Sequence, residues 1–393
     1  MSHPPLQAFS MTPYGLQGDS TLAELQLASS AFAVGPQLAR AADPVPGAKP
    51  LSVAHLGPCL FRGGAEQQLI DLHHFFDPSQ VVLTKCLVTN SNAIDPRVAA
   101  DLKCPVLVAT TEELARTATE NDILLFWGLK LDELLPKSDA YKAKCVYLAH
   151  GDSWWTKELL DGSRGMTTHT IAVSQRVVEE TCDHVPHTKI HNGVDTARLA
   201  TTRSRDEMRA SLGFEPEDFV VGFVGRFSPE KRPELLIESL SRLPRHYKAL
   251  FVGWGTQRQE LMDKANRLIP NRYAFAVADQ YLGDYYQSMD AFSLLSVQEG
   301  FAMVLIEAMF SGLPIVATSV GAVPEVMVDR VNGLVVDGTS DQISRAVSLL
   351  QERREWAASL GREARRYACQ FGHARRMALD YQNLLTSLCR QGA

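Results

Sequence analysis

The 393-residue chain contains no apolar run that approaches the ~20 residues needed to cross a bilayer. Its N-terminus also lacks a basic segment followed by an apolar one, which is the pattern of a secretory signal. Basic residues are not in excess, since 39 Lys and Arg stand against 45 Asp and Glu. A nucleic-acid partner is therefore not expected, and we predict a cytoplasmic protein.

Several short motifs are missing as well. The seven cysteines form no C-x-x-C pair and are odd in number, which favours free thiols in a reducing compartment over disulfides or a zinc site. No Asp-x-Asp sequence is present to hold a divalent metal, and no G-x-G-x-x-G follows a predicted strand. The sequence therefore argues against a nicotinamide-dependent oxidoreductase, and we expect neither a metal nor another cofactor.

The length of the chain favours two domains over a single hydrophobic core. Residues 1–50 differ from the rest, because they are rich in Ala, Pro, Ser and Gln and carry few charges. Within them, 21–34 has the pattern of one helix between a tail and a linker. We assign this N-terminal extension no function.

From residue 51 onward, short β-branched runs alternate with helical patterns, beginning with LSVAHL, VVLTKCLV and DILLFWG. After a polar stretch over 195–218 the alternation restarts with FVVGFVG and KALFVGWG. This order is typical of parallel, doubly wound sheets. The sequence predicts an α/β protein with two Rossmann-like domains, 51–200 and 201–370, and a helical segment over 371–393.

Ligands of open parallel sheets bind beyond the carboxyl ends of the strands, and three segments place polar residues there. One is the RGGAE turn from Arg62 to Glu66, after the first strand, in which Gly63 and Gly64 would let the backbone approach a ligand or a facing domain closely. In GFVGRFSPEKRPEL, a strand ends near Gly225 and is followed by Arg226 and Lys231. A forked guanidinium and an ammonium on one loop suit a diphosphate. From the residues alone, a solvated basic loop explains this segment equally well.

The third segment is QEGFAMVLIEAM, in which Glu299 and Gly300 precede an apolar helix. The free amides at the start of that helix would form an anion site. Glu307 lies within the apolar run, where a carboxylate is costly unless it is hydrogen-bonded, and a pair of ligand hydroxyls would supply that partner. The alternative is an exposed glutamate at the edge of the helix.

These segments together resemble the retaining glycosyltransferases of family 4, which have the GT-B fold. The resemblance rests on VGRFSPEK, EGFAMVLIEAMFSGLPIVAT, GAVPEV and NGLVV in the second half, and on GGAE, AVSQ and HNGVD in the first. It covers roughly 51–390. It also implies that the last helix crosses back onto the N-terminal domain.

The resemblance implies a role for each matching residue. Glu307 would hold the ribose hydroxyls of a nucleotide sugar, Glu299 would face the sugar, and Arg226 and Lys231 would bind the diphosphate. The amides of a helix N-terminus would bind the distal phosphate, Gly64 would approach from the other domain, and Val277 would line the nucleotide. His150, at the end of KCVYLAH, would lie near the sugar and the acceptor. The amides in question belong to Ala302, Met303 and Val304.

The resemblance implies transfer of a sugar from a nucleoside-diphosphate sugar to an acceptor hydroxyl, with retention of configuration by front-face attack. A sugar-nucleotide epimerase and a non-catalytic sugar-nucleotide-binding protein remain alternatives. Phe275 stands where the family commonly has glycine, which leaves the base open. Residues 51–200 carry 14 Lys and Arg against 19 Asp and Glu, a balance of −5, so we expect a soluble acceptor rather than a lipid in an anionic membrane.

Overall fold

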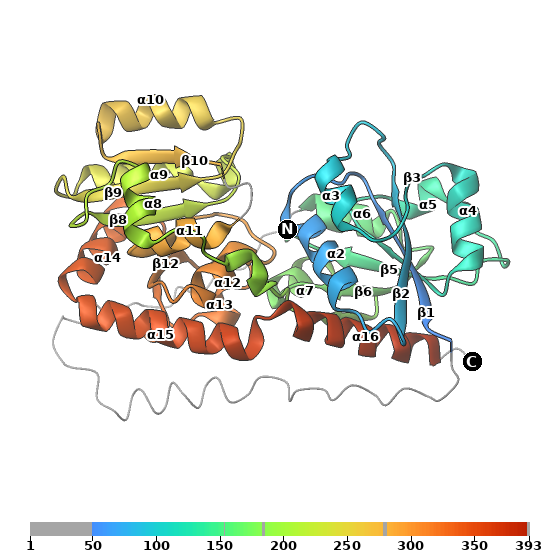
Figure 1. Ribbon diagram of the computed structural model, residues 1–393. Coiled ribbons are helices and arrows are strands. Elements are labelled where there is room, and N and C mark those ends of the chain that lie inside the picture. Colours follow the sequence, from blue (N-terminus) through green and yellow to red (C-terminus); the bar gives the residue numbers. More distant parts are fainter. Residues whose placement is uncertain (1–48, 153, 183–184, 278–280, 391–393) are drawn as a thin grey trace, which may run out of the picture. The chain divides into compact units, whose positions relative to one another are not determined.

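The computed structural model describes residues 49–152, 154–182, 185–277 and 281–390. The segment 1–48, including the helix expected over 21–34, lies outside the described residues. The described chain forms two parallel sheets, each flanked by helices (Figure 1). The predicted α/β class with two Rossmann-like domains is confirmed.

The first sheet has seven parallel strands in the order β3-β2-β1-β4-β5-β6-β7. Its strands are β1 (Leu51–Gly57), β2 (Val81–Val88), β3 (Val106–Val108), β4 (Ile123–Phe126), β5 (Lys144–Ala149), β6 (Thr167–Ala172) and β7 (His187–Lys189). Its helices are α2 (Gly64–Phe75), α3 (Pro96–Asp101), α4 (Thr111–Glu120), α5 (Leu131–Leu134), α6 (Trp154–Asp161) and α7 (Gln175–Thr181). The strand order reverses between β1 and β4, which is where ligands of such sheets bind.

The second sheet has six parallel strands in the order β10-β9-β8-β11-β12-β13. Its strands are β8 (Phe219–Val224), β9 (Tyr247–Val252), β10 (Tyr273–Ala276), β11 (Ala291–Leu294), β12 (Ile315–Thr318) and β13 (Leu334–Val336). Its helices are α8 (Arg205–Ser211), α9 (Pro233–Ser241), α10 (Arg258–Leu268), α11 (Leu282–Ser288), α12 (Met303–Phe310), α13 (Val323–Val326), α14 (Ser340–Glu352) and α15 (Arg354–Phe371). Here the order reverses between β8 and β11.

Each face of the second sheet has its own hydrophobic core. The helix α12 and the end of α15 pack on one face, whereas α9 and α14 pack on the other. All six residues of β8 are buried, as expected for a strand that is covered on both faces. None of the helices in the part of the chain that the structure describes has the length and hydrophobicity of a membrane span.

The chain passes between the two sheets twice, and the two crossings touch. The amide of Val194 donates to the Gly372 carbonyl (2.8 Å), and the amide of Ala374 donates to the Val194 carbonyl (3.1 Å). The first crossing continues through the short 3₁₀ helix η2 (Thr196–Leu199). After the second, α16 (Ala374–Arg390) packs in the core of the first sheet, where the Tyr381 hydroxyl accepts a hydrogen bond from Gln68 (2.9 Å).

A carboxylate on α13 ties the two halves together at a separate point. Glu325 accepts hydrogen bonds from the Gln175 amide (2.7 Å) and from Lys189 Nζ (2.5 Å), and lies 3.0 Å from His191 Nε2. Burial raises the pKa of Glu325, but these bonds outweigh burial and lower it to about 2. The carboxylate is therefore ionised throughout the physiological pH range.

Candidate functional site

The loop after β8 brings Lys231 to Glu299, which follows β11. Lys231 Nζ lies 2.7 Å from Glu299 Oε2, and the Ser296 hydroxyl donates to Glu299 Oε1 (2.8 Å). Arg232 adopts a left-handed conformation (φ 49°) between a 3₁₀ turn and Pro233, and this sharp change of direction presents Lys231. A cation and a carboxylate are thus held together at the carboxyl end of the second sheet.

Arg226 precedes Lys231 on the same loop but has a different environment. Its side chain is exposed, and its guanidinium lies 5.8 Å from the ring centre of Trp254, which is itself half exposed. The packing on an aromatic face orients the guanidinium and leaves its N–H groups available. The Arg226 guanidinium is therefore exposed on the same loop that carries Lys231.

Glu307 is almost fully buried, with only 2% of its surface exposed. The Tyr286 hydroxyl donates to its Oε2 atom (2.8 Å), and Arg198 Nη1 lies 3.4 Å from Oε1. Burial, and then the neighbouring carboxylate, raise the pKa of Tyr286 well above its usual value, so this phenol stays protonated and donates. The expectation of a buried carboxylate at this position is correct.

Sequence reasoning did not find Tyr286 or Arg198. Tyr286 lies on α11, 21 residues before Glu307, and Arg198 lies on η2 in the first crossing between the sheets. A tyrosine within a helical pattern and an arginine in a polar linker carry no local signal of a shared partner. Each carboxylate oxygen retains the capacity to accept a further hydrogen bond beyond these contacts.

The helix α12 begins where the sequence predicted an anion site. Ala302 is its N-cap and the helix proper starts at Met303, so the first amides have no partner within the helix. Ala302 and Met303 are buried and Val304 is half-buried. The loop that holds Glu299 leads directly into this N-terminus.

His150 follows β5 of the first sheet and lies edge-on to Trp127, with 5.5 Å between the ring centres. Its Nε2 atom is buried and has no hydrogen-bond partner among the described residues. Burial lowers the pKa of His150 to about 4, and burial followed by the proximity of His150 lowers that of His55 to about 3. Both rings are therefore neutral near pH 7. The unpaired Nε2 atom could therefore donate a hydrogen bond to a ligand or accept one from it, depending on the tautomer of the ring.

Glycines bring the loops of the two sheets together. A Cβ atom on Gly300 would lie only 1.8 Å from the carbonyl oxygen of His150, whereas a Cβ on Gly64 would meet Met303 Sδ at an ordinary 3.8 Å. Gly300 therefore allows the Glu299 loop to touch the His150 loop backbone to backbone. Gly64 faces Met303, the first residue of α12.

The GGAE turn also carries a carboxyl group to which the sequence assigned no role. Glu66 is 6% exposed, and the Cys59 thiol donates to its Oε1 atom at 3.5 Å. Burial raises the pKa of Glu66. A Cβ on Gly63 would lie 2.7 Å from Glu66 Oε2, so this glycine makes room for the carboxyl group.

The environment of Phe275 differs from the position considered for it beside the nucleotide base. Its ring stacks on Phe251 (4.8 Å between centres, 16° between planes) and packs with the core on the face opposite α12. Val277, just beyond β10, is 57% exposed, and its carbonyl accepts a hydrogen bond from the Tyr285 hydroxyl (3.4 Å). The Phe275 ring is thus held by aromatic packing on that face of the second sheet.

The contact between Gly300 and His150 generates a stability test. We expect Gly300→Ala to destabilise the protein by about 1–3 kcal/mol, because the new methyl group forces two backbones apart. Gly64→Ala is the matched control, since its methyl group meets one flexible side chain at ordinary distance. Thermal unfolding of both variants tests this. Equal unfolding temperatures for Gly300→Ala and the parent protein would contradict the close approach.

Comparison with known proteins places this geometry in a family context. Residues 204–367 match the family model described as Glycosyl transferases group 1. The D-inositol 3-phosphate glycosyltransferase of Mycolicibacterium smegmatis is 31% identical over 232 residues, which are 56% of this chain and 52% of that protein. The lipopolysaccharide core biosynthesis mannosyltransferase LpsB of Rhizobium meliloti is 28% identical over 218 residues, 51% of this chain and 62% of that protein. The chain thus spans about half the length of the curated relatives it matches.

Solved structures establish the fold of a larger part of the chain. HepE from Anabaena in complex with UDP-glucose superposes with a TM-score of 0.75 at 22% identity, covering 86% of this chain and 100% of that one. Sucrose-phosphate synthase from Thermosynechococcus elongatus gives a TM-score of 0.69 at 17% identity, covering 86% and 99%. The described chain has the GT-B fold, and its residues 204–367 carry the sequence pattern of the group 1 glycosyltransferases.

Proposed function

We propose that this protein is a retaining glycosyltransferase that moves a sugar from a nucleoside-diphosphate sugar to an acceptor hydroxyl. One observation carries the proposal: a Lys231–Glu299 ion pair leads into the free N-terminus of α12, and the same helix buries Glu307 one turn later. Lys231 matches the diphosphate of one nucleotide-sugar ligand, the amides of α12 match its distal phosphate, and Glu307 matches its ribose. The family match over 204–367 supports this assignment.

The donor we propose is a UDP-sugar. HepE, which shares the fold, is described in complexes with UDP and with UDP-glucose. In the proposed complex, Arg226 and Lys231 neutralise the diphosphate while the amides of Ala302, Met303 and Val304 donate to its distal phosphate. Glu307 accepts hydrogen bonds from the ribose hydroxyls.

The difficult step is departure of the diphosphate from an oxocarbenium-like sugar. Preorganised cations and helix amides stabilise the negative charge that develops on the leaving group. Glu299 is engaged by Ser296 and Lys231 through its two oxygens, so it is better suited to orient sugar hydroxyls than to attack the anomeric carbon. This arrangement supports front-face attack by the acceptor, with retention of configuration.

The acceptor side belongs to the first sheet. We propose that His150 Nε2, which is buried without a partner, hydrogen-bonds a sugar or acceptor hydroxyl. The named substrates of the relatives include a small phosphorylated polyol, D-inositol 3-phosphate. Together with the −5 charge balance of residues 51–200, this favours a soluble acceptor over a membrane lipid.

Ribose recognition by Glu307 can be tested with a nucleotide that lacks one hydroxyl. We expect the parent protein to bind UDP about tenfold or more tightly than 2′-deoxy-UDP, because a hydrogen bond to a charged group is lost. Glu307→Ala should weaken UDP binding and abolish the difference between the nucleotides. Calorimetric titration measures both, with Glu307→Gln as the control that keeps the side-chain shape. A variant that still discriminates the two nucleotides would exclude this role.

A role for His150 in transfer predicts a loss of rate without a matching loss of donor affinity. We expect His150→Ala to lower kcat about 10–100-fold, while the UDP dissociation constant changes less than about threefold. Substitution of the exposed His187 serves as the control. Because the pKa of His150 is lowered to about 4, the ring is neutral above that pH and is protonated only below it. An acid limb of kcat near pH 6.5 that disappears in His150→Ala would contradict the assignment.

We propose that binding of the diphosphate requires no metal ion. We expect turnover of UDP-glucose to stay within about twofold in excess EDTA, because Arg226, Lys231 and the α12 amides supply the positive charge. The measurement is UDP release with and without EDTA. Activity that vanishes in EDTA and returns with manganese would overturn this part of the proposal.

The acceptor proposal has two readouts. UDP release that requires an added hydroxyl acceptor would distinguish a transferase from an epimerase and from a binding protein without turnover. D-inositol 3-phosphate is the first soluble acceptor to test. We further expect little co-sedimentation with anionic phosphatidylserine vesicles at physiological salt. Strong co-sedimentation under those conditions would exclude the soluble-acceptor assignment.

A further inference from the structure

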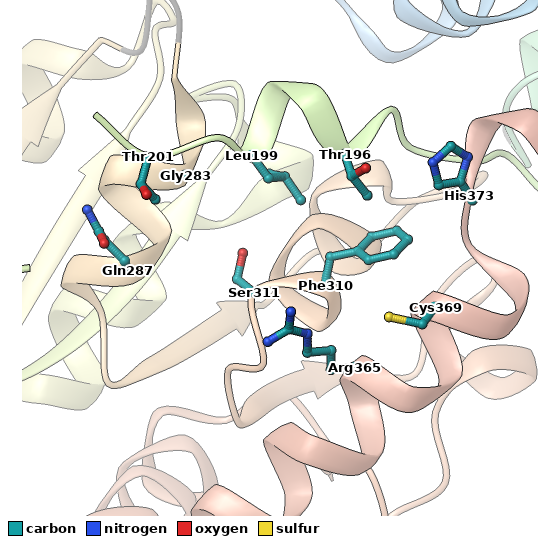
Figure 2. A pocket seen from close by; sticks show the side chains of 10 residues that line it. All are labelled: Thr196, Leu199, Thr201, Gly283, Gln287, Phe310, Ser311, Arg365, Cys369 and His373. Atoms are coloured by element: carbon teal, nitrogen blue, oxygen red, sulfur yellow. The ribbon is translucent and has the colours of Figure 1, made fainter. Parts of the chain in front are cut away.

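A cavity of about 570 Å³ lies at the two crossings between the sheets, and none of the residues assigned to the proposed donor site lines it. Figure 2 shows the side chains that line it. They are Thr196, Leu199, Thr201, Gly283, Gln287, Phe310, Ser311, Arg365, Cys369 and His373. The volume falls within the range of pockets that hold small molecules.

The lining combines apolar and polar groups and carries one guanidinium, that of Arg365. Arg365 is exposed and has no ion pair or hydrogen bond within the described parts of the chain. No carboxylate occurs among the described lining residues, whereas Thr196, Thr201 and Ser311 contribute hydroxyls and Gln287 an amide. An unpaired guanidinium attracts an anion, and the surrounding hydroxyls and amide suit a ligand with hydroxyls of its own.

His373 adds a further hydrogen-bonding group. The Arg375 amide donates to His373 Nδ1 (3.0 Å), so the proton of the neutral ring resides on Nε2. Phe75 and Phe310 pack edge-on against the ring, with centres 5.6 and 6.5 Å away, and fix its orientation. The imidazole is thus held in place at the rim of the cavity.

Both crossings between the sheets contribute walls to this cavity. Thr196 and Leu199 come from η2 in the first crossing, and His373 lies between α15 and α16 in the second. Arg198, between those two η2 residues, contacts Glu307. The Ser311 hydroxyl, which also lines the cavity, donates to the Glu307 carbonyl (2.9 Å).

We propose that this cavity binds a small hydroxylated anion, a sugar phosphate or a sugar acid, on Arg365, and that the ligand holds the two crossings together. This cavity shares no lining residue with the proposed donor site, and its existence does not depend on the proposed transferase activity. Because the crossings are the segments that any movement between the sheets must bend, an occupied cavity restrains that movement.

Cys369 provides a local readout of occupancy. It is exposed and lines the cavity, whereas the other six cysteines are buried or half-buried. The experiment follows alkylation of Cys369 by iodoacetamide with peptide mass spectrometry. Glucose 6-phosphate and gluconate are the probes, and inorganic phosphate and glucose separate the contributions of the anion and the hydroxyls.

We expect glucose 6-phosphate or gluconate to slow Cys369 alkylation at least fivefold, with saturation, and glucose alone to leave it unchanged. Arg365→Ala should abolish this protection, judged as the ratio of rates with and without probe in the same variant. Arg362→Ala, an exposed arginine of the same helix outside the cavity, should retain it. Arg226→Ala should also retain the protection, because Arg226 is proposed to bind the diphosphate of the donor and does not line the cavity.

A second measurement reports on the crossings themselves. Hydrogen exchange of the backbone amides over 194–201 and 369–376 should slow at least threefold with a saturating protective probe in the parent protein, but not in Arg365→Ala. Absence of saturable protection by either hydroxylated anion at 10 mM, about the weakest binding useful for a metabolite, would overturn the proposal. Protection that survives in Arg365→Ala, or disappears equally in Arg362→Ala, would also overturn it.

Discussion

The burial of the Glu307 carboxylate constrains much of the surrounding structure. A charge removed from water in an apolar core is tolerated only when other groups pair with it, and loss of a partner typically costs about 3–5 kcal/mol. Here the partners are a tyrosine from α11 and an arginine from the first crossing between the sheets. One helix carboxylate therefore fixes the position of two segments that are distant in the sequence.

Arg198 extends this constraint to the first sheet. Burial raises the pKa of Asp71 on α2 to about 7, although the Gln67 amide and the charge of Arg198 lower it. The guanidinium thus acts on carboxyl groups from both halves of the molecule. Arg198 stands on η2 in the first crossing, so its contact with Glu307 links that carboxylate directly to a segment that joins the two halves.

The pattern of the sequence predicts the sheets and the loops, but not the pairings across them. Alternation of short apolar runs with helices is a local property, so the two parallel sheets and the loops with Arg226, Lys231 and Glu299 could be anticipated. The apolar neighbours of Glu307 likewise predict its burial. Its pairing with Tyr286 and Arg198 depends on tertiary packing that no local pattern encodes. Side chains of a strand alternate between the two faces of a sheet. The face on which Phe275 lies could not be assigned from the sequence, because it depends on which helices cover each face.

The two sides of the candidate site differ in how their buried ionisable side chains avoid an unpaired charge. On the second sheet, charges are retained and paired, as in Lys231 with Glu299, so that the proposed diphosphate would meet a fixed positive charge. On the first sheet, burial leaves His150 and His55 neutral, so these rings neither repel the cations opposite nor require counter-ions. Gly300 allows the two surfaces to meet without an intervening side chain. The charged side chains therefore lie on the second sheet, where negative charge would develop on the leaving group of the proposed reaction. The neutral hydrogen-bonding groups lie on the first sheet, where the hydroxyls would bind.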